Sequence, residues 1–322
     1  MTTKSILENI VQKGILPEEQ AILITDYERT KSFSIHRELR AILYLGITLL
    51  TTGLGILIYK NIDTIGHQAI IALITASIIG CSYYVFRNRQ PFNRGVINNS
   101  NQFSEYALIL ACTLFLILEG YLQYQYQFFG SRYGIAIFIP TVIFFLCAYR
   151  FDNRAVLSMA ITGLASWLGL TISPLSVLEK NDFSAPGIIV TGIVLGILLI
   201  FIGWLSDTRS FKSHFEFTYV LFGGNLAAIS GLAGLFKNEP KLIYFLVTSA
   251  LCVFLIRTAR KNQSLIFLLM GVIYGYISLT YGAFLFLPDS ILAAMSIFYF
   301  LFTSLGVLFF LLNVKKILGL KK

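Results

Sequence analysis

Charged side chains are scarce in this sequence: only 13% of the 322 residues are charged, about half the usual share, whereas 56% are hydrophobic. A water-soluble protein of this composition could not cover its surface with polar groups, which excludes an ordinary soluble fold. A lipid bilayer removes that requirement, because an apolar exterior is then the stable one. The composition therefore indicates an integral membrane protein.

Motifs for catalysis and cofactor binding are lacking as well. The sequence has no phosphate-binding Gly-Lys-Ser/Thr loop, no His-Glu-x-x-His motif and no Gly-x-Ser-x-Gly motif. Its three histidines, His36, His67 and His214, lie near the ends of apolar runs. The four cysteines lie inside such runs without Cys-x-x-Cys spacing, and we interpret them as small buried hydrophobic residues. We predict no enzyme activity, no metal site and no cofactor.

A secretory signal is not visible, because the first 38 residues are polar and mixed in charge. Ile6 and Ile10 recur there at helical spacing, Gly14 is suited to ending that helix, and Pro17 to beginning another. We predict a cytoplasmic helical hairpin over residues 1–38. A DNA-reading helix-turn-helix is the alternative, but no basic recognition helix follows, so we expect no nucleic-acid partner.

Long apolar runs are what the sequence has in abundance. A run of about 20 apolar residues is long enough to cross the hydrocarbon region as a helix. We predict an all-α transmembrane bundle over residues 39–312, followed by a basic cytoplasmic tail at 313–322. The ten predicted spans are residues 39–59, 65–86, 104–125, 133–149, 153–172, 185–205, 215–236, 241–258, 263–282 and 288–312.

The basic residues predict how these spans are oriented. Cytoplasmic loops of membrane proteins carry an excess of Lys and Arg. If the N-terminus is inside, the outer segments hold five of the 25 basic residues and the cytoplasmic segments hold the remaining 20. The five are Lys60, Arg132, Lys180, Lys237 and Lys241. This division predicts an even number of spans with both termini in the cytoplasm.

Residues 14–63 resemble a known family. They begin Gly14-Ile15-Leu16-Pro17-Glu18-Glu19-Gln20-Ala21, and the Gly-rich first span ends in Tyr59-Lys60-Asn61-Ile62-Asp63. This is similar to the predicted bacterial membrane proteins of domain-of-unknown-function family 2157. Their pattern starts with Gly-Leu-Ile-x-x-Glu-Gln-Ala, and their span ends in Asn-Trp-Asp, where this chain has Ile62 in place of the Trp. The resemblance implies a bacterial inner-membrane protein without an assigned activity, and it supplies no catalytic residues.

An ionisable side chain inside a span is a functional candidate, because charge is costly to bury in lipid. Glu119 is the clearest case, and counting from Glu105 at about 1.5 Å per residue places it in the outer third of the bilayer. Either its carboxylate reaches the outer water, or it forms a proton or cation site in an outward cavity. Pro140, in the fourth span, is a candidate helix break that could free a backbone carbonyl.

Asn225 is a second polar candidate, midway along the seventh span and directly after Gly223 and Gly224. Paired glycines suit a broken helix of the kind found at transporter sites. They also suit close helix packing, which the small-xxx-small spacing around them favours. In the ninth span, the hydroxyl of Tyr274 needs a partner, so we expect this side chain to face the bundle.

Two functional hypotheses follow. The first is a carrier of small solutes or lipids, because ten spans with both ends inside is a common carrier plan. Five spans per half would make any internal repeat inverted, but no convincing repeat is found. The alternative is a non-transporting scaffold or sensor that acts through the N-terminal hairpin. An intramembrane enzyme comes third, for want of catalytic residues. Expected partners are membrane lipids, a small-molecule solute and a protein partner of the hairpin.

Thiol labelling tests the predicted orientation. A cysteine introduced at Lys180 should react with a membrane-impermeant reagent added from outside, whereas one introduced at Arg209 should not, because the charge distribution places the latter in the cytoplasm. The extent of labelling in intact cells is the measurement. The reverse pattern would overturn the orientation.

Overall fold

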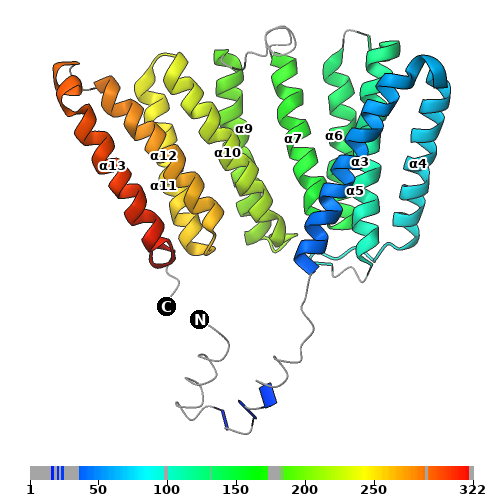
Figure 1. The fold of residues 1–322 in the computed structure, drawn as a ribbon, viewed down its shortest axis with the longest axis horizontal. Coiled ribbons are helices and arrows are strands. Elements are labelled where there is room, and N and C mark those ends of the chain that lie inside the picture. The colour runs from blue at the N-terminus through cyan, green and yellow to red at the C-terminus, as the bar shows by residue number, and fades with distance from the viewer. Residues whose placement is uncertain are drawn as a thin grey trace.

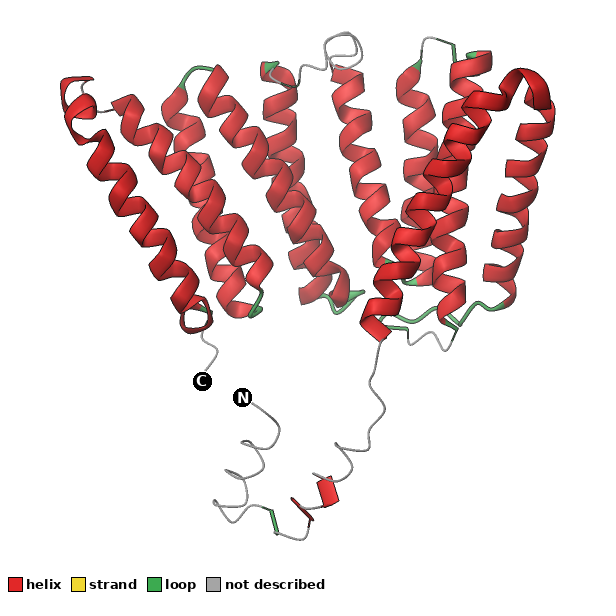
Figure 2. Ribbon diagram, viewed as in Figure 1, coloured by secondary structure: helices red, strands yellow, loops and turns green. Residues whose placement is uncertain are grey.

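The computed structural model is all-helical over the part of the chain that it describes (Figure 2). The described residues are 36–97, 101–130, 132–172, 185–286 and 289–318, together with 16, 17, 20, 21, 23, 24 and 183. Most of the predicted hairpin at 1–38 therefore lies outside the described residues and stays a prediction. The last residues of the predicted basic tail also lie outside them.

Ten long helices follow one another in the described residues, and each coincides with one predicted span. The largest difference at an end is six residues, at Ile65 against the predicted 59. A short 3₁₀ turn, η1 (Ser213–Phe215), precedes the seventh helix. The helices are α3 (His36–Ile65), α4 (His67–Arg87), α5 (Gln102–Tyr126), α6 (Tyr133–Phe151), α7 (Arg154–Ile172), α9 (Pro186–Thr208), α10 (Glu216–Lys237), α11 (Lys241–Lys261), α12 (Leu265–Phe286) and α13 (Asp289–Ile317).

The helices stand side by side and alternate in direction, so that α3 begins at the same face of the bundle at which α13 ends (Figure 1). The links α4–α5, α6–α7, α9–α10 and α11–α12 also lie at this face, which we name the basic face after Arg94, Arg150, Arg209 and Lys261 at or near those links. The even number of helices and the charge alternation predicted from the sequence are thus compatible with the architecture.

Length and composition identify eight described helices that could cross a membrane. The first and last helices, α3 and α13, contain the shorter apolar stretches Ala41–Leu57 and Phe298–Val307. Large apolar side chains such as Leu49, Ile79 and Val194 are exposed on the outside of the bundle. An apolar exterior on a helical bundle is the arrangement that lipid stabilises, and about ten spans remain consistent with it.

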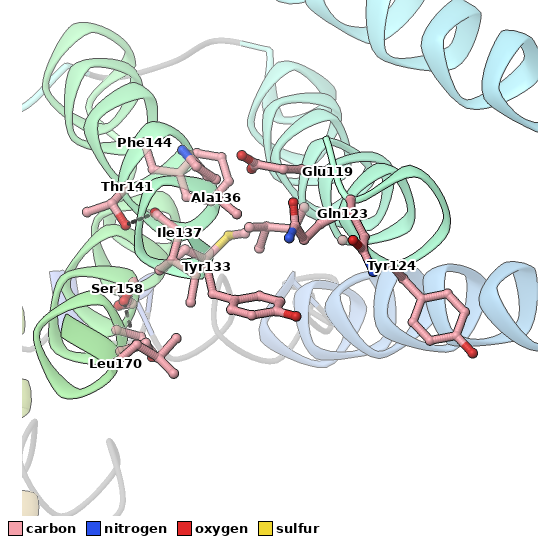
Figure 3. A pocket seen from close by; sticks show the side chains of 18 residues that line it. Glu119, Gln123, Tyr124, Tyr133, Ala136, Ile137, Thr141, Phe144, Ser158 and Leu170 are labelled. Atoms are coloured by element: carbon pink, nitrogen blue, oxygen red, sulfur yellow. Dashed lines mark hydrogen bonds between the residues drawn. The ribbon is translucent and has the colours of Figure 1, made fainter. Parts of the chain in front are cut away.

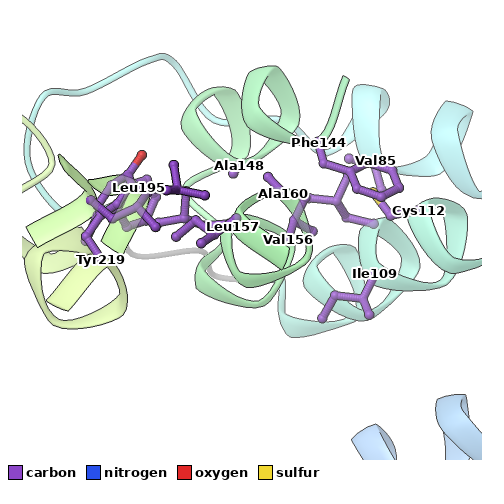
Figure 4. Close-up of a cluster of buried hydrophobic side chains, with 14 residues drawn as sticks. Val85, Ile109, Cys112, Phe144, Ala148, Val156, Leu157, Ala160, Leu195 and Tyr219 are labelled. Atoms are coloured by element: carbon purple, nitrogen blue, oxygen red, sulfur yellow. The ribbon is translucent and has the colours of Figure 1, made fainter. Parts of the chain in front are cut away.

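Helix α7 lies at the centre of the larger apolar core (Figure 4). Val156, Leu157 and Ala160 on this helix are fully buried, and they pack between the helices on either side, including α6 through Ala148 and α9 through Leu195. A second core joins α10, α11 and α12 around Ala228, Leu255 and Phe267. Two apolar cores, one centred on α7 and one joining α10 to α11 and α12, therefore hold the bundle together.

Glycines set the closest helix contacts. A Cβ atom on Gly196 would lie 2.6 Å from the carbonyl oxygen of Gly223, and a Cβ on Gly223 would lie 2.6 Å from that of Gly196. Helices α9 and α10 can approach this closely only because neither residue has a side chain. Gly271 meets Ile256 of α11 in the same way. Small residues are the usual means of helix association in lipid, where apolar burial gives little driving force.

Both places where a helix break was considered from the sequence lie within continuous helices. Helix α10 continues without interruption through Gly223 and Gly224, because both glycines are buried in helix contacts that support the backbone on two sides. Helix α6 likewise continues through Pro140. There the hydroxyl of Thr141 donates to the carbonyl of Ile137 at 2.7 Å, and Thr141 packs on Gly163 of α7. Neighbouring helices of this kind allow proline inside a membrane helix.

The glycine contact between α9 and α10 can be tested by adding one methyl group. Gly223→Ala should lower the free energy of unfolding by about 1–3 kcal/mol, the usual cost of forcing an extra group into a closely packed site. The control is Gly80→Ala on α4, where a Cβ would meet nothing within 4 Å. Alanine forms helices better than glycine, so the control should be neutral or slightly stabilising. Thermal unfolding in one detergent measures both, and equal midpoints would contradict the packing role.

Candidate functional site

A pocket of about 900 Å³ lies between α5, α6 and α7 (Figure 3). Helices α6 and α7 pack against each other along their length, whereas α5 touches each of them only sparsely. The pocket occupies the space that this sparse contact leaves. Its lining follows α7 from Ser158 to Leu170, which corresponds to about 18 Å of helix at about 1.5 Å per residue.

Glu119 is the charged side chain of this pocket. It is only 8% exposed, and its Oε2 atom has no hydrogen-bond partner among the described residues. Figure 3 shows the carboxylate directed from α5 toward α6, on the side of Phe144 and Ala136. The structure thus places Glu119 in a cavity within the bundle. A buried carboxylate oxygen without a partner is costly, because it has lost its water and gained nothing in return.

Three of the hydroxyl groups that line the pocket already donate their protons to the backbone. Thr141 donates to the carbonyl of Ile137 at 2.7 Å, and Thr162 donates to that of Ser158 at 2.9 Å. Ser158 in turn donates to the carbonyl of Arg154 at 3.0 Å. A hydroxyl that has donated its proton still has lone pairs on its oxygen. These side chains therefore offer acceptors to a molecule in the pocket.

Pro140 adds a further acceptor. Proline has no backbone N–H, so the carbonyl of Ala136, four residues earlier, loses the donor that an α-helix would supply. Ala136 and Pro140 both line the pocket. The structure therefore brings two sequence candidates, Glu119 and Pro140, together in one cavity.

Gln123 closes one end of the pocket and bonds to the turn beyond it. Its Nε2 donates to the carbonyl of Gly130 at 2.8 Å, and its Oε1 accepts from the backbone N–H of Phe129 at 3.0 Å. The turn begins at Gln127 and contains Gly130, both with positive φ (46° and 58°). The side chain therefore stabilises the turn after α5 through one donated and one accepted hydrogen bond.

A second cavity of about 520 Å³ lies next to the first, between α7, α9 and α10. The two share Ile137, Ser166 and Leu170 in their linings. None of the described residues that line the second cavity has an ionisable side chain. The two cavities together offer a polar end at Glu119 and an apolar continuation.

The part of the chain that forms most of this site matches a family model. Residues 8–157 match the family described as "Predicted membrane protein (DUF2157)". The match contains residues 14–63 and confirms the resemblance noted in the sequence. No curated protein and no solved structure matches the chain.

The DUF2157 segment includes Glu119, Pro140 and the start of α7, and it ends before α9. Its description gives a membrane protein without an activity. The site therefore has to be interpreted from its own chemistry.

Asn225 and Tyr274, which lie beyond the DUF2157 segment, form a separate polar pair. The Tyr274 hydroxyl of α12 donates to Oδ1 of Asn225 on α10 at 2.6 Å. The Asn225 Nδ2 atom donates to the carbonyl of Leu221 at 3.0 Å and lies 3.7 Å from the sulfur of Met270. Tyr274 thus faces the bundle, but neither residue lines the pocket that contains Glu119. Their hydrogen bonds satisfy each other and join α10 to α12.

A buried ionic cluster at the basic face was not predicted from the sequence. Lys212 is completely buried, and its Nζ lies 2.8 Å from Oδ1 of Asp152, which is 2.7 Å from Nε2 of His214. The other oxygen of Asp152 accepts from the backbone N–H of Ile97 at 2.7 Å. Lys212 also donates to the carbonyl of Gly95 at 3.3 Å. The Asp152–Lys212–His214 cluster thereby ties together the links α4–α5, α6–α7 and α9–α10.

Local geometry explains why this cluster is not visible in the sequence. Asp152 and Lys212 both have left-handed backbones (φ 58° and 52°), which turn their side chains inward from tight links between helices. Aromatic rings cover the pair, with the Lys212 Nζ 5.3 Å from the ring centre of Phe92. In sequence, Lys212 looks like one more cytoplasmic lysine, and it is 60 residues away from Asp152. Only the folded chain brings the two charges together.

The ionic cluster should contribute strongly to stability. Lys212→Met should lower the free energy of unfolding by about 3–5 kcal/mol, because it leaves the buried Asp152 carboxylate without its cation. Arg209→Met, at an exposed position of the same link, is the matched control and should change little. Adding Asp152→Asn to Lys212→Met should recover part of the loss, since it removes the unpaired charge. Unfolding midpoints that do not separate Lys212→Met from its control would contradict this role.

Proposed function

We propose that this membrane protein is a carrier that binds a small amphipathic solute or lipid in the α5–α6–α7 pocket. The observation that carries the proposal is Glu119: a buried carboxylate with an unpartnered oxygen, directed into a cavity of about 900 Å³. Buried polar groups are nearly always hydrogen-bonded, so an exception calls for a ligand or a function. Ligand pockets typically measure about 300–1,000 Å³, and this cavity lies within that range.

The polar groups of the pocket support binding more than catalysis. Glu119 is the only ionisable acid among the described residues that line it, and they include no His, Lys or Cys to act with it as a base or nucleophile. The described residues also contain no group of three or more His, Cys, Asp or Glu that could hold a metal ion. An ionisable residue inside a span is typical of substrate and ion pathways.

We propose further that the basic face is cytoplasmic and that the protein resides in a bacterial inner membrane. The excess of Lys and Arg in the segments at that face supports the orientation. The pocket would then lie toward the outer side of the bilayer, because Gln123 and the turn that it closes are at the opposite end of α5 from the basic face. Such a location suits capture or release of a solute on the outer side.

A thermal-shift screen against lipids and soluble metabolites tests whether the pocket binds a ligand. A ligand that binds only the folded protein should stabilise it by about 2.7 kcal/mol at a hundredfold excess over its Kd. Gly120→Leu should abolish the shift, because Gly120 lines the pocket and a Cβ there meets nothing within 4 Å, so the added side chain can fill the cavity. Gly80→Leu, in an equally open position on α4 outside the pocket, should keep it.

Uptake of the stabilising compound into proteoliposomes then distinguishes a carrier from a receptor. The wild-type protein should accumulate or equilibrate the compound faster than empty vesicles, and Gly120→Leu should remove the difference. A ligand-induced shift that survives Gly120→Leu would place the binding site elsewhere. Binding without any uptake would overturn the carrier role while leaving the site in place.

A further inference from the structure

We infer that the α5–α6–α7 pocket selects an organic ammonium ion, a small molecule with a protonated amine and an apolar body. This inference rests on the proposed binding role of the pocket and deepens it. It rests on the one acidic side chain in the lining, on the absence of a basic side chain among the described lining residues, and on three hydroxyl groups whose protons are already donated.

Three hydroxyl groups of the pocket lining can offer only acceptors to a ligand. The hydroxyl protons of Thr141, Ser158 and Thr162 are already donated to backbone carbonyls. The carbonyl of Ala136 has lost its helical donor to Pro140. A ligand that contacts any of these groups must therefore supply N–H or O–H donors, as an ammonium group does.

The charge of the lining is also one-sided. Glu119 is the one carboxyl group among the described residues that line the pocket, and they include no Lys, Arg or His to balance it. Glu119 forms no ion pair among the described residues either. A cation would favour the ionised form of the Glu119 carboxyl group and form a charge-assisted hydrogen bond with it, whereas an anionic ligand would meet a like charge.

Size and apolar lining favour an organic cation over a metal ion. Hard metal ions take about six to eight oxygen ligands, and a single carboxylate cannot provide most of them. Leu116, Phe144, Met159 and Leu170 instead form an apolar wall beside the carboxylate. The lining extends for about 18 Å along α7, and the second cavity continues it past Leu170. A long or branched apolar body can therefore lie along α7 with its amine at Glu119.

Three probes that differ in one group test the inference: 4-phenylbutylamine, 4-phenylbutanol and 4-phenylbutyrate share a body but carry a cation, a neutral hydroxyl and an anion. Their binding is measured by calorimetry to the protein in nanodiscs of zwitterionic lipid, after subtraction of empty nanodiscs. The wild type should bind the amine about tenfold more tightly than the alcohol, since a charged hydrogen bond exceeds a neutral one by about 1.4 kcal/mol. The carboxylate should bind weakest.

Glu119→Gln should bind the amine and the alcohol within about twofold of each other, because the amide keeps the shape of the side chain but removes its charge. Glu105→Gln, on the same helix outside the pocket, should keep the preference for the amine. Because the three probes are compared on the wild type first, the test does not depend on a variant that folds.

The outcomes separate this inference from the proposed function. Equal binding of amine and alcohol by the wild type, or tighter binding of the carboxylate, would overturn the inference and leave a pocket that binds without selecting charge. A preference for the amine that survives Glu119→Gln would overturn it too. No binding of any of the three probes would count against both the inference and the carrier proposal.

Discussion

The apolar solvent is the constraint on which the rest of this structure depends. In lipid, each backbone must satisfy its own hydrogen bonds, which leaves the helix as the only form for these apolar runs. The hydrophobic effect then gives little reason for one helix to meet another, so contact depends on how closely the backbones can approach. Gly196 and Gly223 allow α9 and α10 to pack closely, and Gly163 of α7 leaves room for the Thr141 side chain of α6. At Gly120 on α5 no neighbour fills the space, and the pocket lies there.

Three sets of buried polar groups meet the same constraint in different ways. Asn225 and Tyr274 satisfy each other across α10 and α12, so they require nothing from outside. Lys212 and Asp152 form an ion pair, and each side chain also makes a hydrogen bond to a backbone group of the α4–α5 link. Glu119 has no such solution among the described residues. Some buried hydroxyls, such as those of Thr248 and Ser278, also lack a partner, but Glu119 combines an unpartnered carboxyl oxygen with a place in the lining of the pocket, which distinguishes it as a functional candidate.

The ionic cluster and the pocket are related through α5, α6 and α7. At the basic face, Asp152 and Lys212 hold the links of these helices to the start of α10. Along the bundle, α6 and α7 remain in contact while α5 touches them only sparsely, and the pocket occupies that region (Figure 3). The three helices are thus fastened at one end and leave a cavity along their length. A bundle fastened in this way provides a stable frame around the cavity.

The sequence by itself determined the number, order and approximate ends of the helices, because each apolar run has the length of a bilayer and is bounded by polar residues. It also identified Glu119 and Pro140, since a charge and a missing N–H are visible in any apolar run. Tertiary structure alone decided which candidates meet. Pro140 joins Glu119 in one cavity, whereas Asn225 pairs with Tyr274 elsewhere. The pairing of Asp152 with Lys212 was also decided only by the tertiary structure. Contacts between distant links depend on which helices lie side by side, and apolar runs of similar composition do not indicate which helices will be neighbours.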